Sequence, residues 1–89
     1  MKIKLPQDSE FSVYIYTNDH QPAHVHIFKP RYGTGQPSIK IELGDSYTPP
    51  KIVGCDPRIN KKDIKAAWSL VAKNQEFLLQ EWYRIHGFP

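Results

Sequence analysis

The chain has little cysteine and no long apolar segment, and both scarcities limit the classes of protein to which it can belong. Its single cysteine, Cys55, cannot form an internal disulfide, and no Cys-x-x-Cys pair is present to hold a structural zinc ion. No apolar run approaches the length that crosses a bilayer. The first ten residues include two lysines but no apolar segment of the signal-peptide kind. We therefore expect a protein of the reducing cytoplasm that is neither secreted nor inserted into a membrane.

The chain is also short and only weakly charged. With 89 residues it can build one hydrophobic core, so we expect a single domain over residues 1–89. A composition of 39% hydrophobic and 24% charged residues is that of a folded domain, and we expect it to fold without a cofactor. The formal net charge of +3 favours an acidic partner but falls short of the charge density of a dedicated nucleic-acid-binding arm.

The first two thirds of the chain show the alternation of a β-sheet. Apolar and polar residues alternate over 11–17, 23–29 and 38–43, which predicts three strands. Residues 18–22 are turn-forming types, so the first two strands are predicted to form a β-hairpin. Residues 51–55 follow a pair of prolines and predict a short fourth strand at an edge of the sheet.

The last third of the chain changes to the spacing of a helix. Apolar residues recur three and four positions apart across 61–86, with Asn60 as the predicted N-cap and Gly87 as the predicted end. Asn74 and Gln75 interrupt the apolar stripe, so one helix and a pair of helices both remain open. The stripe and the apolar sheet face must cover each other. The prediction is an α+β fold, a three- to four-stranded antiparallel β-meander packed on one face by a C-terminal α-helix or helix pair.

One face of the predicted hairpin gathers the residues best suited to chemistry. If Thr17 pairs with Ala23 across the turn, Tyr16 lies opposite His24 and Tyr14 lies opposite His26, on the side of the hairpin that points away from the core. Three of the four histidines of the chain also fall within seven residues. The residues predicted on this face are Tyr14, Tyr16, His24, His26, Lys40 and Glu42, with Asp19 and His20 at its rim.

Three interpretations fit this face, and the first is a metal site. His24 and His26 are two residues apart on a strand and can present two imidazole nitrogens to one ion. His20, Asp19 or the more distant His86 could complete the three protein ligands of a catalytic zinc ion. Two histidines at this spacing are a much weaker signal than His-Glu-x-x-His on a helix. Zinc or another divalent metal is therefore an alternative that the sequence allows but does not require.

The second interpretation is acid–base catalysis on RNA without a metal. One histidine would accept the proton of the 2′-hydroxyl group and another would protonate the leaving oxygen. Lys29, Arg31 and Lys40 are the candidates to hold the phosphate, while Tyr14 and Tyr16 could stack on unpaired bases. The catalytic candidates are His20, His24, His26 and Asp19.

The third interpretation assigns no chemistry to this face. Exposed aromatic side chains and histidines are common at interfaces, so the face could hold a partner protein through Tyr14 and Tyr16 as a non-enzymatic binding module. The remaining features have structural explanations. Trp68 and Trp82 lie on the apolar stripe, and Cys55 is expected to be a small packed residue rather than a nucleophile.

The run Tyr16-Thr-Asn-Asp-His-Gln-Pro-Ala-His-Val-His26 resembles the signature of the bacterial domain-of-unknown-function family 4160. The similarity continues through the third predicted strand to Glu81-Trp-Tyr-Arg-Ile-His-Gly87. The chain departs from the usual pattern at Ala23, where a second proline is common, and in a longer stretch over 31–57. The residues onto which the motif carries over are Asn18, Asp19, His20, Pro22, His24 and His26.

The resemblance implies little about activity, because the family is defined without a function. Its genes are often considered parts of toxin–antitoxin pairs, each beside the gene of a second small protein. Our leading hypothesis is a toxin–antitoxin component that acts on RNA through the histidine face, with a cognate small protein from a neighbouring gene as partner. A non-enzymatic protein-binding module and a zinc-binding, hydrolase-like site are the two alternatives.

Overall fold

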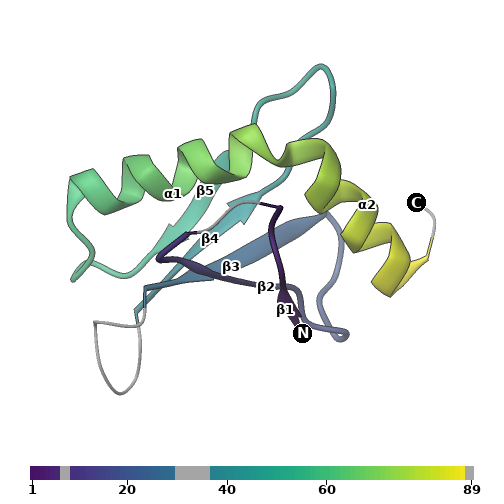
Figure 1. Cartoon of the computed structure of the whole chain (residues 1–89), viewed down its shortest axis with the longest axis horizontal. Coiled ribbons are helices and arrows are strands. Elements are labelled where there is room, and N and C mark those ends of the chain that lie inside the picture. Colours follow the sequence, from purple (N-terminus) through teal and green to yellow (C-terminus); the bar gives the residue numbers. More distant parts are fainter. Residues whose placement is uncertain (7–8, 30–36, 88–89) are drawn as a thin grey trace.

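The chain folds into a sheet and two helices, described here by a computed structural model over residues 1–6, 9–29 and 37–87. Within this part of the chain the sheet has five antiparallel strands in the order β1-β2-β3-β4-β5. Figure 1 shows both helices on one face of the sheet, which confirms the predicted α+β architecture. The elements are β1 (Lys2–Ile3), β2 (Ser12–Tyr14), β3 (His24–Phe28), β4 (Ser38–Glu42), β5 (Lys51–Cys55), α1 (Lys61–Lys73) and α2 (Gln75–His86).

The strands confirm the predicted meander and add one short strand to it. β1 pairs with β2, where Lys2 lies opposite Tyr14, and its two residues are too few to show an alternation. The strand predicted over 11–17 is shorter, because β2 ends at Tyr14. Toward the turn, the backbone N–H of Tyr16 donates to Asp19 Oδ2 at 3.0 Å and not to a neighbouring strand. β5 occupies the predicted residues.

The core lies between the sheet and the helices. Every second residue of the central strands points into it, as the period of a strand requires. Each fully buried valine, leucine or isoleucine side chain contributes about 1.5–3 kcal/mol to stability. The apolar residues that are at most 1% exposed are Val13, Ile15, Val25, Ile27, Ile39, Ile41, Leu43, Ala67, Val71, Leu78 and Trp82. The opposite sheet face is therefore left to the polar and aromatic residues that alternate with them.

Asn74 separates the two helices, so the predicted interruption of the stripe is a break into a helix pair. Its side-chain Nδ2 donates to the carbonyl oxygen of Leu70 at 2.8 Å. The neighbouring Gln75 Nε2 donates to the carbonyl oxygen of Leu43 at 2.7 Å and so ties the break to the end of β4. Beyond the break, α2 passes over the turn between β2 and β3 (Figure 1). Among the described residues, no helix is both long and apolar enough to cross a bilayer.

A buried ion pair joins the sheet to the start of α1. Lys29 Nζ donates to Asp63 Oδ1 at 2.8 Å, and the two side chains are only 5% and 6% exposed. The backbone N–H of Asp63 donates to Asn60 Oδ1, which confirms Asn60 as the N-cap. Lys29 was a sequence candidate to hold a phosphate. That assignment is wrong, because Lys29 has the same orientation as Val25 and Ile27 and is buried.

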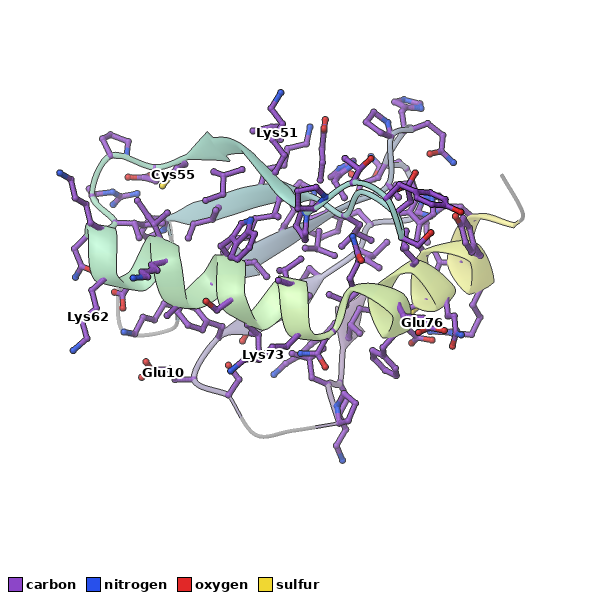
Figure 2. All side chains as sticks on the ribbon, turned by 90° about the horizontal axis from the view of Figure 1, so that it is seen from above. Glu10, Lys51, Cys55, Lys62, Lys73 and Glu76 are labelled. Carbon is purple, nitrogen blue, oxygen red and sulfur yellow. The ribbon has the colours of Figure 1, made fainter. Side chains whose placement is uncertain are left out.

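Cys55 lies on β5 at an edge of the sheet. Figure 2 shows it along one border of the molecule together with Lys51, while Glu10 lies on the opposite side. The expectation of a packed cysteine is wrong, because the residue is exposed. Partial desolvation of its sulfur and the nearby Asp56 carboxylate raise the pKa of the Cys55 thiol, so it lacks the thiolate character of a nucleophile.

Candidate functional site

Asp19, His24 and His26 form the most compact group of ligand-type side chains in the described part of the chain, and we call it the Asp–His cluster. It lies where the turn after β2 meets the start of β3. His24 Nε2 is 3.4 Å from Asp19 Oδ1, and His26 Nε2 is 3.3 Å from Asp19 Oδ2. The three possible ligand atoms all lie within 4.8 Å of one another. One carboxylate thus stands between two imidazoles.

Asp19 is held in place by the backbone of the turn. Its Oδ2 accepts from the backbone N–H of Tyr16 at 3.0 Å, and its own N–H donates to the carbonyl oxygen of Tyr16 at 3.0 Å. An aspartate can close a turn in this way because its short side chain reaches a nearby backbone amide. The turn therefore fixes the carboxylate beside the two histidines of β3.

The ring of His24 is oriented by the backbone on one side and by a helix on the other. Its Nδ1 lies 2.9 Å from the carbonyl oxygen of Pro22, and because a carbonyl can only accept, Nδ1 carries the proton. The ring centroid is 5.3 Å from that of Trp82 on α2, and His24 is 5% exposed. In neutral His24 the lone pair therefore belongs to Nε2, the atom that faces Asp19.

The end of α2 packs against the turn between β2 and β3. His86 stacks on Trp82 with ring centroids 3.9 Å apart, and its Nε2 lies 3.0 Å from the carbonyl oxygen of Tyr16. His86 was a sequence candidate for a distant third ligand. The structure does not bring it into the Asp–His cluster, and it contacts the same turn that holds Asp19.

A cavity of about 220 Å³ opens beside the Asp–His cluster. Across β3 and β4, His24 lies opposite Glu42 and His26 lies opposite Lys40, which is why all four residues border the same space. His20 is exposed and also borders the cavity, but it does not belong to the cluster. The lining residues are Asn18, Asp19, His20, Gln21, Pro22, His24, His26, Lys40 and Glu42.

The local charges set the protonation states of the cluster. Burial alone would raise the pKa of Asp19, but the hydrogen bond from Tyr16 and the nearby His24 and His26 outweigh it, so this pKa lies below its ordinary value. Burial lowers the pKa of His26, and His24 and Lys40 add to this effect against the opposing influence of Asp19. At neutral pH, Asp19 is an anion and His26 is neutral.

Aromatic rings extend from the cluster along the same sheet face. The Tyr16 ring packs against His26 at a centroid distance of 4.9 Å and stacks on Tyr14 at 6.0 Å. Tyr14 meets Phe28 edge-on at 5.5 Å. The predicted register is confirmed where β2 and β3 pair, with Tyr14 opposite His26. Because β2 ends there, the expected partner of Tyr16, His24, is replaced by His26.

The structure brings together most of the residues that the sequence singled out. Lys40 and Glu42 join the cavity, whereas Arg31 lies outside the described residues. The sequence did not reveal the roles of Pro22 and Trp82 beside His24. A backbone carbonyl leaves no signal in a sequence, and Trp82 follows the apolar stripe, so its spacing indicated only core packing.

One comparison with known proteins gives a match to this chain. A family model described as Domain of unknown function (DUF4160) matches residues 11–83. This range includes the whole Asp–His cluster and Tyr14, Tyr16, Lys40 and Glu42 beside it. A search of curated proteins and a search of solved structures each gave no match.

Proposed function

We propose that this chain, which belongs to the domain-of-unknown-function family 4160, is a toxin–antitoxin component that acts on RNA. The observation that carries the proposal is the pair of stacked tyrosines beside the Asp–His cluster, which alternate along the chain with the buried Val13 and Ile15. The proposed two-gene context comes from the family resemblance alone. The proposed RNA substrate comes from the chemistry of the face.

The aromatic rings favour a single-stranded nucleic acid. Bases stack on aromatic side chains only when they are free of a duplex, and each such contact is worth about 1–3 kcal/mol. Tyr14 and Tyr16 supply two neighbouring rings in the manner of open-sheet RNA-binding modules. The exposed Lys40 lies opposite His26, and Lys2 lies opposite Tyr14. These cations would neutralise phosphates that pass along the strands.

The geometry of the cluster favours one reaction centre rather than a separate acid and base. A two-histidine scheme requires nitrogens that face the phosphate from two sides. In the structure, Nε2 of His24 and Nε2 of His26 both face the Asp19 carboxylate. We therefore assign phosphodiester cleavage to the cluster as a unit, with Lys40 contacting the phosphate and Glu42 forming part of the cavity wall.

Binding of a labelled single-stranded RNA to the purified chain tests the proposed substrate. We expect Tyr14→Leu and Tyr16→Leu each to weaken binding by about 5- to 150-fold, the equivalent of one lost stacking contact. Tyr47→Leu is the matched control, because Tyr47 is 95% exposed and lies in the loop before β5. Wild-type affinity in the Tyr14 and Tyr16 variants would contradict an RNA-binding role for this face.

Expression in bacteria tests the proposed toxin–antitoxin role. We expect growth arrest by the wild-type chain and its rescue by Asp19→Asn, while the control Asp56→Asn, at a partly exposed aspartate that pairs with Arg58, still arrests growth. Equal arrest by both variants, or no arrest by the wild type, would contradict the proposal. Copurification with the product of a neighbouring gene, lost in Tyr14→Leu and without RNA binding, would assign the face to a partner protein instead.

A further inference from the structure

We propose that Asp19, His24 and His26 bind one divalent transition-metal ion, with zinc as the ion that fits the donor set best. Two imidazole nitrogens and one carboxylate oxygen are ligands that zinc takes in catalytic sites. A role of the ion in RNA cleavage rests on the proposed function. The binding of the ion does not, because it follows from the geometry of the three side chains alone.

The spacing of the ligand atoms supports an ion between them. Bonds of about 2.0–2.2 Å in a tetrahedral arrangement place neighbouring ligand atoms about 3.3–3.6 Å apart. Both Nε2 atoms lie 3.4 Å from the same oxygen, Asp19 Oδ1. A direct charge-assisted hydrogen bond would be shorter, at about 2.7–2.9 Å. The contact between His26 and Asp19 is a long hydrogen bond, and the distances of both nitrogens from Oδ1 are those of ligands that share one ion.

The orientation of His24 gives independent support. Its Nδ1–H donates to the carbonyl oxygen of Pro22, so Nε2 is the ring atom left to face the Asp19 carboxylate, at 3.4 Å. Histidines that bind metals commonly donate their other ring N–H to a backbone carbonyl, which fixes the tautomer in this way.

The surroundings fit a catalytic site rather than a structural one. Three protein ligands leave one position of a tetrahedral ion open, and the cluster borders the cavity that Lys40 and Glu42 also line. An ion at this place would hold a water molecule of lowered pKa next to the proposed phosphate path. The Tyr16 peptide and the Pro22 carbonyl supply the supporting hydrogen bonds that hold metal ligands in position.

Zinc titration of the untagged protein, stripped with a chelator beforehand, tests the inference. We expect saturable binding of one ion, measured by calorimetry, and movement of the His24 and His26 imidazole resonances in NMR spectra. Asp19→Asn and His26→Gln should each weaken binding by about 10-fold or more, with circular dichroism to confirm the fold. His24 is not used, because its ring packs on Trp82. Magnesium should leave the spectra unchanged, because it prefers oxygen ligands.

Two controls separate this inference from the proposed function. His20→Ala and Asp56→Asn should retain wild-type affinity for zinc, since neither residue belongs to the cluster. Absence of saturable binding, equal affinity in Asp19→Asn, or loss of binding in His20→Ala would overturn the assigned ligand set. The titration contains no RNA, so failure of the chain to bind RNA would leave the metal site standing. RNA cleavage that persists in excess chelator would overturn the role of the ion in cleavage, while the titration alone decides whether the ion binds.

Discussion

Two places in the described part of the chain hold a charged side chain largely away from solvent, and they differ in how closely the partners of that charge approach. At the start of α1, Lys29 and Asp63 carry opposite charges and meet at 2.8 Å. At the turn of the hairpin, Asp19 faces two imidazoles at 3.3–3.4 Å and borders a cavity. The first arrangement joins a strand to a helix, whereas the second has room for a further cation. Burial of charge alone therefore does not mark a functional site, and we place the proposed metal site where the contacts are long and a cavity is open.

The largest effect on stability should come from breaking the ion pair between Lys29 and Asp63. Lys29→Met leaves the Asp63 carboxylate buried without this cation, so we expect the free energy of unfolding to fall by about 3–5 kcal/mol in urea denaturation. Arg84→Met is the matched control, because Arg84 pairs with Glu81 at the surface and its side chain is 56% exposed. Loss of an exposed pair costs about 0–1 kcal/mol. Equal losses in the two variants would contradict a structural role for the Lys29–Asp63 pair.

A double substitution sharpens this result. Replacing both members of a buried ion pair by apolar residues of similar size removes the unmatched charge. We therefore expect Lys29→Met/Asp63→Leu to be more stable than Lys29→Met alone, although Asp63 also stands in the first turn of α1. A double variant that is less stable than the single one would show that the Asp63 carboxylate stabilises the helix more than its burial costs.

The Asp–His cluster, in contrast, should be stabilised by a bound metal ion. Zinc at about 100 times its dissociation constant should raise the free energy of unfolding of the wild type by about 2.7 kcal/mol, because the ion binds the folded chain. Asp19→Asn binds at least about 10-fold more weakly, so at the same zinc concentration its increase should be about 1.4 kcal/mol or less. Lys29→Met should retain the increase if the two charge sites are independent. A smaller increase in Lys29→Met than in the wild type would show that they are coupled.

Without metal, the same cluster should make stability depend on pH. The folded-state pKa values of His26 and Asp19 are both below their ordinary values of 6.5 and 3.8, so the unfolded chain takes up these protons first as the pH falls. The stabilising contribution of His26 is therefore complete above pH 6.5 and declines below it, and that of Asp19 declines below pH 3.8. We expect urea midpoints to fall less between about pH 7 and about pH 5 in His26→Gln than in the wild type. An equal fall would contradict the lowered pKa of His26.

The sequence predicted those parts of the fold that depend on a local period. The alternation of β2 and β3 was sufficient to place Tyr14 opposite His26, and the polar interruption at Asn74 marked the break between the helices. It could not predict β1, which has two residues. Nor could it show that β2 ends early, because the Tyr16 N–H is taken by a side chain three residues away.

The candidate site was predictable in its residues but not in its assembly. The spacing of His24 and His26 placed both on one strand face, and Asp19 was expected at the rim. The conformation of the turn decides that Asp19 enters the cluster while His20 stays at the cavity border. The packing of Trp82 against His24 depends on where α2 crosses the hairpin, and a helical period contains no information about that crossing.

Trp82 links the core to the Asp–His cluster, and its replacement should have the smallest effect on stability. Its Nε1 is buried and has no hydrogen-bond partner within the described residues. A buried donor without a partner costs about 1–3 kcal/mol. Trp82→Phe loses packing area but also removes this donor, so we expect the free energy of unfolding to change by about 1 kcal/mol or less. Zinc affinity should still fall several-fold, because the phenyl ring covers less of the His24 imidazole.

The control for Trp82→Phe is Leu78→Ala, another fully buried position on α2. It should cost about 2–5 kcal/mol of unfolding free energy and leave zinc affinity unchanged, since Leu78 is not among the residues that border the cavity. Trp82→Phe should thus lower zinc affinity with little change in stability, whereas Leu78→Ala should lower stability and leave zinc affinity unchanged. If zinc affinity instead followed stability in both, the Asp–His cluster would depend on the general integrity of the core and not on the contact between Trp82 and His24.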